Sequence, residues 1–228
     1  DGPVLQLFKH HRVLEQTVLP GASHLLLAAA AQLSRYPEGA GTYVELTDAV
    51  FERPFVVPED GGVRTVCRAA TDHTEIASCG GGMEEVIHAR IGASHVAGGP
   101  GSHGAAPWQG LDEWRSLCGE PKEAAAESLY ASYKEVGLDY GPSFQTLRAC
   151  AFCGTGALAW LTSPSSMWER SLQLLHPALL DGALQLLVHC ATQQSDRPGA
   201  FLPFIVGRAV VSTRCPPGPL WASARVLQ

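Results

Sequence analysis

The sequence predicts an α+β fold in which antiparallel sheets wrap two buried helices. Residues 22–33 and 178–189 have the composition of helices that are apolar on nearly every side. A helix without a polar face must be enclosed, and in a chain of 228 residues we expect a sheet to enclose it. Strand-like runs separated by turn residues accompany both segments. Because this arrangement occurs twice, we expect two similar halves that repeat in plan and not in sequence.

The first buried helix is followed by the predicted strands of the front half. Pro20-Gly21 precedes this helix, and a proline in a first turn loses only an N–H that has no intrahelical acceptor. Turn residues at 58–62 and 80–82 separate the extended runs that follow. The predicted strands of this half are 42–49, 51–57, 63–70, 74–79 and 85–94.

The back half repeats this plan with a second buried helix after His176-Pro177. Residues 122–136 carry apolar side chains on one side only, which is typical of an amphipathic surface helix. The predicted strands of this half are 146–153, 156–162, 204–213 and 220–226.

The division between the halves is expected at a segment rich in Gly and Pro. Residues 96–108 have the composition of a linker. We therefore predict an N-terminal half at 1–98, a linker at 99–120 and a C-terminal half at 121–228.

Composition argues against several classes of protein. The net charge is −6 and no Lys/Arg run occurs, whereas binding of nucleic acid needs clustered cations. The densest apolar stretch, 25–31, is far shorter than the roughly 20 residues that span a bilayer. No signal-peptide layout precedes it, so we expect a cytoplasmic protein with neither nucleic acid nor membrane as partner. The chain begins at Asp1 and ends in a strand-like run, which favours a piece of a longer protein.

Seven cysteines are scattered along the chain, and only Cys150 and Cys153 have C-x-x-C spacing. A zinc ribbon needs a second such pair. The pair lies in an apolar, extended run, where side chains three positions apart fall on opposite faces. We therefore expect buried, reduced thiols.

The first candidate for chemistry is His11, nine residues before the proline that starts the first buried helix. The free N–H groups and the positive dipole end of that helix would then lie close to the imidazole, ready to hold a carbonyl oxygen. The competing interpretation is a histidine that only satisfies its own structural hydrogen bonds.

The second candidate is Asp181, in the first turns of the second buried helix. Gln185 is four residues further on, so both side chains project from one face. An acid among leucines is unfavourable unless it is paired or neutral. The competing interpretation is an aspartate that caps its own helix. His189 continues the same stripe deeper in the helix and is expected to fill the core.

A third string is Tyr140-Gly-Pro-Ser-Phe144-Gln145, in which a Gly-Pro turn separates two aromatic residues at fixed spacing. Together with Leu202-Pro203-Phe204, the three strings resemble the signatures of polyketide synthase dehydratase domains. His11 and Pro20 fall on the family motif H-x-x-x-G-x-x-x-x-P. Residues 140–145 match Y-G-P-x-F-Q, and residues 176–185 match H-P-x-x-x-D-x-x-x-Q/H. The resemblance spans nearly the whole chain and implies a double hot-dog fold.

The resemblance also implies an activity, namely loss of water from a β-hydroxyacyl thioester to give a trans, sometimes cis, α,β-unsaturated thioester. It implies that His11 takes the α-proton and that protonated Asp181 gives a proton to the leaving hydroxyl. Gln185 would orient the carboxyl group, and Tyr140 would contact the β-hydroxyl.

Further implied features concern the thioester and its carrier. Pro20, Gly21 and Phe144 are implied as supporting residues, with the N–H groups after Pro20 receiving the thioester carbonyl. The implied partners are an acyl carrier protein, which holds the substrate on phosphopantetheine, neighbouring synthase domains and a second copy in a homodimer. No cofactor or metal is implied.

The implied mechanism requires Asp181 to be protonated, which its place in the helix opposes. Asp181 must hold a proton, yet a helix N-terminus favours the anion. Only desolvation by the surrounding leucines raises a carboxyl pKa against that effect, and the sequence leaves open which effect is larger.

One departure from the family pattern is Glu15, which stands where the motif has glycine. In the family that glycine lies close to the substrate path, so Glu15 is expected to obstruct it by bulk and charge. This residue favours a competing function, in which the domain is impaired or non-catalytic and serves dimerisation. A relative that shifts a double bond or closes a ring, and a hot-dog thioesterase, are two more functions that fit the predicted fold.

Overall fold

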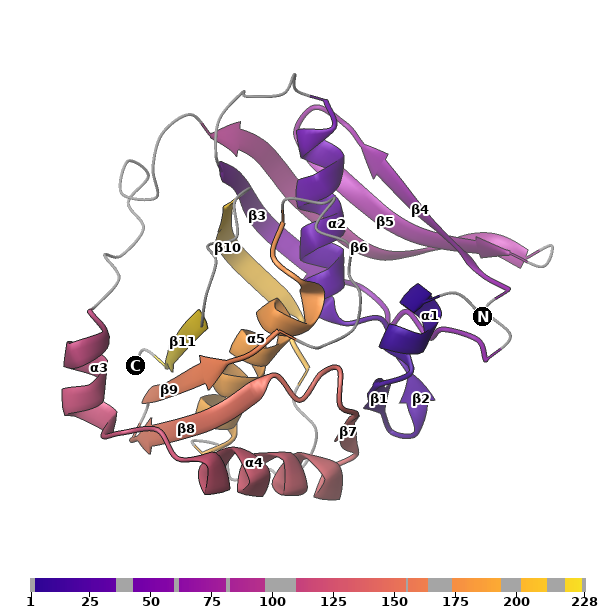
Figure 1. The fold of residues 1–228 in the computed structure, drawn as a ribbon. Coiled ribbons are helices and arrows are strands. Elements are labelled where there is room, and N and C mark those ends of the chain that lie inside the picture. The colour runs from indigo at the N-terminus through magenta and orange to yellow at the C-terminus, as the bar shows by residue number, and fades with distance from the viewer. Residues whose placement is uncertain are drawn as a thin grey trace.

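The computed structural model describes residues 3–35, 43–59, 62–80, 83–96, 110–154, 156–163, 174–193, 202–212 and 220–226. Two helix-and-sheet units lie one above the other in Figure 1. In the upper unit, helix α2 (Gly21–Leu33) packs on a five-stranded antiparallel sheet in the order β10-β3-β6-β5-β4. The strands of this sheet are β3 (Tyr43–Phe51), β4 (Arg64–Ala69), β5 (His73–Gly80), β6 (Met83–Val96) and β10 (Ile205–Ser212).

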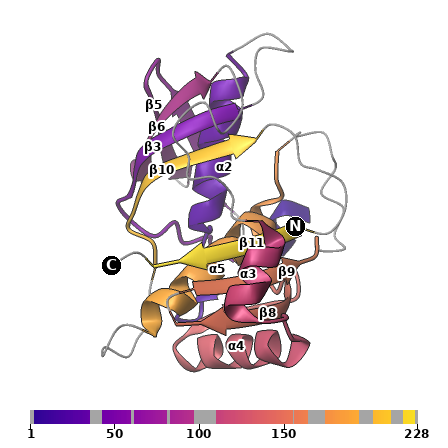
Figure 2. The ribbon, with the colours of Figure 1, turned by 90° about the vertical axis from the view of Figure 1, so that its left-hand side faces the viewer.

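The lower unit has helix α5 (Pro177–Thr192) on a three-stranded sheet in the order β11-β9-β8. Helices α3 (Leu111–Cys118) and α4 (Glu123–Glu135) lie on its outer side (Figure 2). The strands are β8 (Leu147–Cys153), β9 (Gly156–Leu161) and β11 (Leu220–Arg225).

A small third sheet joins segments that are far apart in the sequence. After helix α1 (Pro3–Phe8), strand β1 (His11–Val13) pairs with β2 (Gln16–Thr17) on one side and with β7 (Leu138–Tyr140) on the other. The register places His11 directly opposite Tyr140. This pairing brings the first and third motifs of the sequence together.

The two central helices are as buried as their composition predicts. Leu25, Ala28 and Ala29 of α2 belong to a core shared with the five-stranded sheet. Leu179 and Leu186 of α5 belong to a second core, which includes the inner face of α4. Helices α2 and α5 also pack against each other, so the cores meet at the centre of the molecule.

The helices predicted at 22–33, 122–136 and 178–189 are confirmed, with small differences at their ends. The strand predicted at 51–57 is wrong: β3 ends at Phe51, and residues 52–57 contain only an isolated bridge between Val56 and Val18. Pro54 interrupts this run and donates no ladder hydrogen bond. The segment instead forms part of a pocket wall.

Two observations bear on the predicted halves. Strand β10 comes from the back of the chain but pairs with β3 over Ile205–Ser212, so it completes the sheet of the front unit. Helix α3 falls inside 99–120, where a linker is predicted, and residues 97–109 lie outside the described part of the chain. The division at 98 and 121 itself stays a prediction.

The expectation of reduced thiols is wrong for Cys153, which forms a disulfide with Cys118 of α3. Cys150 is buried and free, as expected. The C-x-x-C spacing does not reveal the pairing because the partner lies 35 residues away in sequence.

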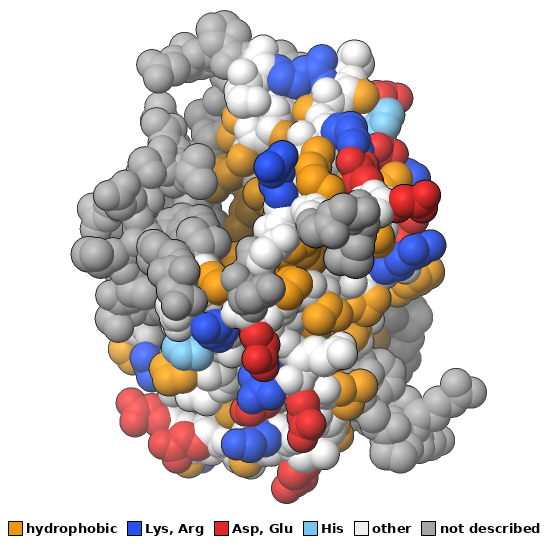
Figure 3. Space-filling model, turned by 90° about the vertical axis from the view of Figure 1, so that its right-hand side faces the viewer, with side chains coloured by type: hydrophobic (Ala, Val, Ile, Leu, Met, Phe, Trp, Pro, Cys, Tyr) orange, Lys and Arg blue, Asp and Glu red, His pale blue; other side chains and the backbone are white. Residues whose placement is uncertain are grey.

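Within the described residues, no helix is long and apolar enough to cross a membrane. On the face shown in Figure 3, acidic and basic side chains are interspersed rather than segregated. Ion pairs between exposed arginines and glutamates include Arg90 with Glu52 and Arg68 with Glu85.

Candidate active site

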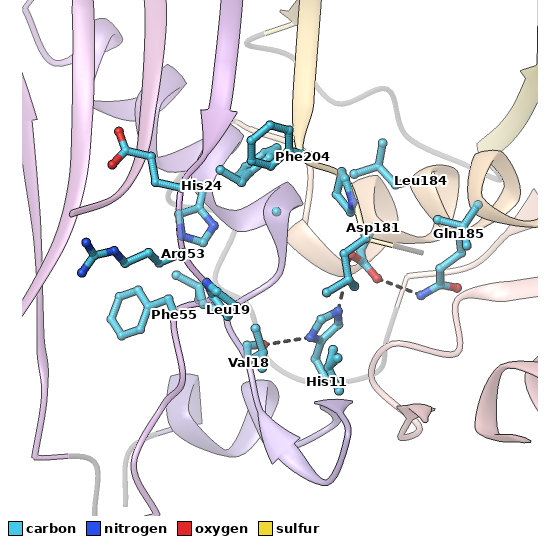
Figure 4. A pocket seen from close by; sticks show the side chains of 18 of the residues that line it. His11, Val18, Leu19, His24, Arg53, Phe55, Asp181, Leu184, Gln185 and Phe204 are labelled. Atoms are coloured by element: carbon cyan, nitrogen blue, oxygen red, sulfur yellow. Dashed lines mark hydrogen bonds and ion pairs between the residues drawn. The ribbon is translucent and has the colours of Figure 1, made fainter. Parts of the chain in front are cut away.

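His11 is held in one orientation by strand β1 and its neighbours. The residue is only 6% exposed, and its Nδ1 lies 2.8 Å from the carbonyl oxygen of Val18. A carbonyl only accepts, so Nδ1 carries the hydrogen and donates it, which leaves Nε2 unprotonated in the neutral ring. The rings of Tyr140 and Phe144 contact the imidazole edge-on, with centroids at 5.5 and 5.2 Å. The free Nε2 is thereby directed at Asp181 (Figure 4).

Asp181 faces that nitrogen from helix α5. The carboxyl oxygen Oδ1 lies 3.8 Å from His11 Nε2, and the residue is 6% exposed. The capping interpretation does not hold, because His176 is the N-cap and its ring accepts from the Ala178 N–H. Asp181 is five positions beyond the cap, so its side chain is free to face the other unit.

Gln185 contacts Asp181 as the four-residue spacing predicts. Its Nε2 donates to Asp181 Oδ2 at 2.8 Å. Burial raises the pKa of Asp181, and this effect outweighs the opposing influence of His11 and the hydrogen bond from Gln185. Burial therefore prevails over these two neighbours and favours the protonated acid.

A cavity of about 280 Å³ contains the pair. Both units and the segments 51–55 and 202–204 contribute to its wall, which is mostly apolar. The lining residues are His11, Val13, Val18, Leu19, Gly21, His24, Phe51, Glu52, Arg53, Pro54, Phe55, Tyr140, Asp181, Leu184, Gln185, Val188, Leu202, Pro203 and Phe204.

The remaining predicted residues lie around this cavity. Tyr140 and Gly21 line it, whereas Pro20 and Phe144 stand behind the wall. Pro20 is the N-cap of α2 and its carbonyl accepts from the Ser23 N–H at 2.9 Å. Phe144 is fully buried against the His11 ring. The structure thus brings all seven predicted site residues into one region.

The start of α2 faces the cavity through Gly21. A side chain there would meet Pro203 Cγ at 3.3 Å and Phe51 Cζ at 3.4 Å, so glycine lets the walls close tightly over the helix end. The Ser23 and His24 N–H groups donate to the Pro20 carbonyl, so the donors that this helix end offers the cavity are the N–H groups before them, together with the positive dipole end.

Glu15 does not obstruct the cavity, contrary to expectation. It is exposed, lies outside the cavity lining and forms a two-residue hairpin turn with Leu14 between β1 and β2. Leu14 and Glu15 have φ of 47° and 67°, the left-handed values that a type I′ turn requires. The motif glycine therefore suits this position because of the turn conformation.

Sequence reasoning missed His24, Arg53 and Phe55 as cavity residues. His24 is 3% exposed, its Nδ1–H donates to the Pro20 carbonyl at 3.0 Å, and desolvation lowers its pKa to about 4. The position of His24 one turn after Pro20 is the signal that could have found it. Arg53 and Phe55 lie in the run predicted to be a strand, so no signal identified them.

No group of three or more His, Cys, Asp or Glu side chains suited to a metal ion occurs among the described residues.

Comparisons with known proteins agree with this geometry. The family model described as "Polyketide synthase dehydratase domain" matches residues 3–79, and that described as "Polyketide synthase dehydratase N-terminal domain" matches residues 109–227. Polyketide synthase ThaG of Burkholderia thailandensis is 28% identical over 94% of this chain, and PksN of Bacillus subtilis is 29% identical over 96%. The chain spans 4% of the length of each.

Solved structures extend the likeness to the fold. The dehydratase domain from the CurF module of the curacin polyketide synthase has a TM-score of 0.80 and 26% identity, with 98% of this chain and 78% of that chain covered. The CurK dehydratase domain matches with a TM-score of 0.78 at 24% identity, over 97% of this chain and 78% of that one. The chain therefore belongs to the polyketide synthase dehydratase family and has its double hot-dog fold.

Proposed function

We propose that this chain removes water from a β-hydroxyacyl thioester to give an α,β-unsaturated thioester, with His11 and Asp181 as its acid–base pair. The observation that carries the proposal is the approach of His11 Nε2 to Asp181 Oδ1, 3.8 Å apart in one buried cavity. One group comes from each half of the chain, and each points its reactive atom at the other.

The reaction starts at the α-carbon of the substrate. His11 Nε2 takes the α-proton, and the hydrogen bond from Nδ1–H to the Val18 carbonyl holds the ring in place and stabilises the resulting imidazolium. Asp181 gives its proton to the β-hydroxyl, the C–O bond breaks, and water and the enoyl thioester form. The cycle closes when the proton on His11 returns to Asp181.

Other residues of the cavity have supporting roles in this proposal. The N–H groups at the start of α2 receive the thioester carbonyl, whose oxygen gains negative charge as the α-proton leaves. Tyr140 contacts the β-hydroxyl from the His11 side of the cavity. Phe144 and Pro20 act from behind the wall, since one packs on His11 and the other caps α2.

Solved relatives support a histidine and an aspartate as the reacting pair of such a domain. Two solved forms of the CurK dehydratase are described as inactive mutants, one with an aspartate replaced by asparagine and one with a histidine replaced by phenylalanine. The competing function of an impaired domain depended on Glu15, which lies outside the cavity lining. Dehydration therefore remains the function that the site supports best.

The relatives also suggest the setting of the reaction. Both synthases that the chain resembles are about twenty-five times longer than the matched segment, since it spans 4% of each. We therefore propose neighbouring synthase domains, an acyl carrier protein that presents the substrate on phosphopantetheine, and a homodimer in the cytoplasm. The chemistry needs no cofactor, because two side chains exchange the protons.

The test is incubation with a β-hydroxyacyl thioester on a carrier protein, read by mass spectrometry as loss of one water. We expect His11→Ala and Asp181→Asn each to lower the rate by about 10²–10⁴, the usual contribution of an acid–base group. Both variants should remain folded, which a cooperative thermal unfolding transition would show. Water loss that survives both changes would remove the assignment, and release of free acid would favour a thioesterase.

A further inference from the structure

Helix α4 reaches the active site through the hydroxyl of Tyr130. The Leu147 N–H donates to this hydroxyl oxygen at 3.0 Å. The hydroxyl in turn donates toward Gln185 Oε1 at 3.2 Å, with the Phe144 carbonyl at 3.4 Å. Tyr130 thus links strand β8 to the side chain that contacts Asp181.

These contacts fix which way the Gln185 amide points. Its Nε2 donates to the Phe144 carbonyl at 3.2 Å and to Asp181 Oδ2 at 2.8 Å. In the flipped amide, Oε1 would face the Phe144 carbonyl, and two acceptors would oppose each other in a buried site. The Tyr130 hydroxyl favours the same orientation, because it presents its hydrogen to Oε1.

The orientation of Gln185 determines which oxygen of Asp181 holds the proton. Oδ2 receives an N–H, so it acts as an acceptor and the acidic hydrogen resides on Oδ1. Oδ1 is the oxygen that faces His11 Nε2 at 3.8 Å. The proton is therefore held on the side of the cavity where the leaving hydroxyl must lie.

We propose that Tyr130 is a positioning residue that holds the Gln185 amide so that Asp181 presents its proton from Oδ1. The inference rests on the proposed dehydration and assigns a role to a helix outside the three sequence motifs. Tyr130 does not line the cavity, so it acts through Gln185 and not on the substrate.

Tyr133 provides a matched control within the same helix. Its hydroxyl also contacts Gln185, but it donates to the backbone carbonyl of that residue. Both tyrosines pack beside Tyr140, with ring centroids at 6.1 and 5.7 Å. Burial raises the pKa of both hydroxyls well above the ordinary value, so both stay protonated. Replacing either with phenylalanine removes one hydroxyl, and only Tyr130→Phe changes the Gln185 amide.

The titratable groups around Asp181 come from several elements. His11 faces it from β1, Tyr140 from β7 and Tyr130 from α4, and Tyr133 lies next to Tyr130. His24 of α2 lines the same cavity. Since the hydrogen bond from Gln185 lowers the pKa of Asp181, loss of that bond raises this pKa further.

The experiment compares Tyr130→Phe with Tyr133→Phe in the full chain. For Tyr130→Phe we expect kcat to fall about tenfold with little change in KM, since one buried hydrogen bond is removed. The alkaline limb of the pH profile, where Asp181 loses its proton, should move to higher pH. Tyr133→Phe should lower thermal stability and leave kcat and this limb unchanged. Equal effects of the two variants on kcat and on the limb would overturn the proposal.

A double-variant cycle separates positioning from an independent role. In a Gln185→Leu background, Tyr130→Phe should change kcat by less than about twofold, because the amide that it positions is absent. If the tenfold loss persists in that background, Tyr130 does not act through Gln185 and the proposal fails.

Two measurements without substrate keep this result distinct from failure of the dehydration itself. A ¹³C NMR titration of the Asp181 carboxyl should give a higher pKa in Tyr130→Phe than in the parent chain and Tyr133→Phe. In the unaltered chain, both Nε2 protons of Gln185 should exchange slowly with solvent. This measurement does not depend on whether any variant folds. An unchanged carboxyl pKa in folded Tyr130→Phe, or fast exchange of either proton, would contradict the assignment.

Discussion

At the scale of single residues, the site depends on carbonyl groups that fix the direction of neighbouring hydrogen bonds. The Val18 carbonyl determines which nitrogen of His11 is free, and the Phe144 carbonyl determines which end of Gln185 faces Asp181. A carbonyl only accepts, so each contact has one possible direction. The site is thereby preorganised before a substrate enters.

His24 provides a prediction of pH dependence at this scale. Its pKa in the folded chain is lowered to about 4 by desolvation, so the unfolded chain binds a proton that the folded chain does not. The free energy of unfolding should therefore fall as pH drops below the ordinary histidine pKa, by up to about 1.4 kcal/mol per pH unit until the folded pKa is reached.

The measurement is urea unfolding of the parent chain and His24→Phe between pH 4.5 and 7.5, a range chosen to span about two units below neutrality. Phenylalanine keeps a ring against Phe51 but has no proton to bind. The stability difference should shift in favour of His24→Phe as pH falls. A difference that stays constant over the range would show that His24 does not resist protonation in the folded state.

At the scale of elements, the β1–β2 hairpin predicts a stabilising substitution. Glu15 adopts φ of 67°, which destabilises an L-residue by about 1–2 kcal/mol. Glycine avoids this strain but loses more conformational entropy on folding, which offsets about 0.5–1 kcal/mol of the gain. We expect Glu15→Gly to raise the free energy of unfolding by about 0.5–1 kcal/mol. Its dehydration rate should not change, because Glu15 lies outside the cavity lining.

Glu15→Ala is the control for this hairpin, since it removes the charge and keeps the Cβ that resists positive φ. It should be no more stable than the parent chain. A large change in rate with Glu15→Gly would restore the hypothesis that this side chain affects the substrate path.

The packing of α5 on its sheet predicts that replacing a helix glycine with alanine, which usually stabilises a helix, is destabilising at Gly182. Glycine in a helix interior is usually less favourable than alanine by about 1 kcal/mol. At Gly182, however, an added Cβ would collide with Thr146 Oγ1 and lie 3.0 Å from Leu161 Cδ2. We expect Gly182→Ala to lower the free energy of unfolding by about 1–3 kcal/mol, as overpacking does.

Gly207→Ala in strand β10 is the comparison for Gly182→Ala, because nothing lies within 4 Å of its added Cβ. Thermal unfolding should separate the two variants clearly. If Gly182→Ala is as stable as the parent chain, the close approach of α5 to Thr146 and to β9 is less strict than the packing indicates.

At the scale of the whole molecule, the two units depend on each other. Strand β10 completes the front sheet, β7 pairs with β1, and α2 packs on α5. Fragments 1–98 and 99–228, which follow the predicted division, should therefore not fold fully when made separately. Each would leave strand edges unpaired and one half of the cavity missing.

Mixing the two fragments should restore both cooperative unfolding and water loss, because His11 and Asp181 lie on different fragments. Circular dichroism and the dehydration assay measure the two properties on the same sample. A stable fold of fragment 1–98 alone would show that β10 is not needed for the front sheet.

The sequence by itself determined the two buried helices and the family, and it predicted seven site residues, which the fold brings into one region. These follow from local features: helices with no polar face, and short motifs in which spacing fixes the relation between side chains. Asp181 and Gln185 contact each other because residues four apart share a helix face.

Only the tertiary structure decided what depends on segments distant in the chain. The transfer of β10 to the front sheet, the Cys118–Cys153 bond and the link from Tyr130 to Asp181 through Gln185 join residues with no local pattern in common. The pKa direction of Asp181 also required the fold, because desolvation depends on everything packed around a carboxyl, whereas the helix dipole is visible in the sequence. The sequence suggested that the motif glycine at position 15 keeps the substrate path open. The folded turn shows instead that this position needs a positive φ, which only the structure reveals.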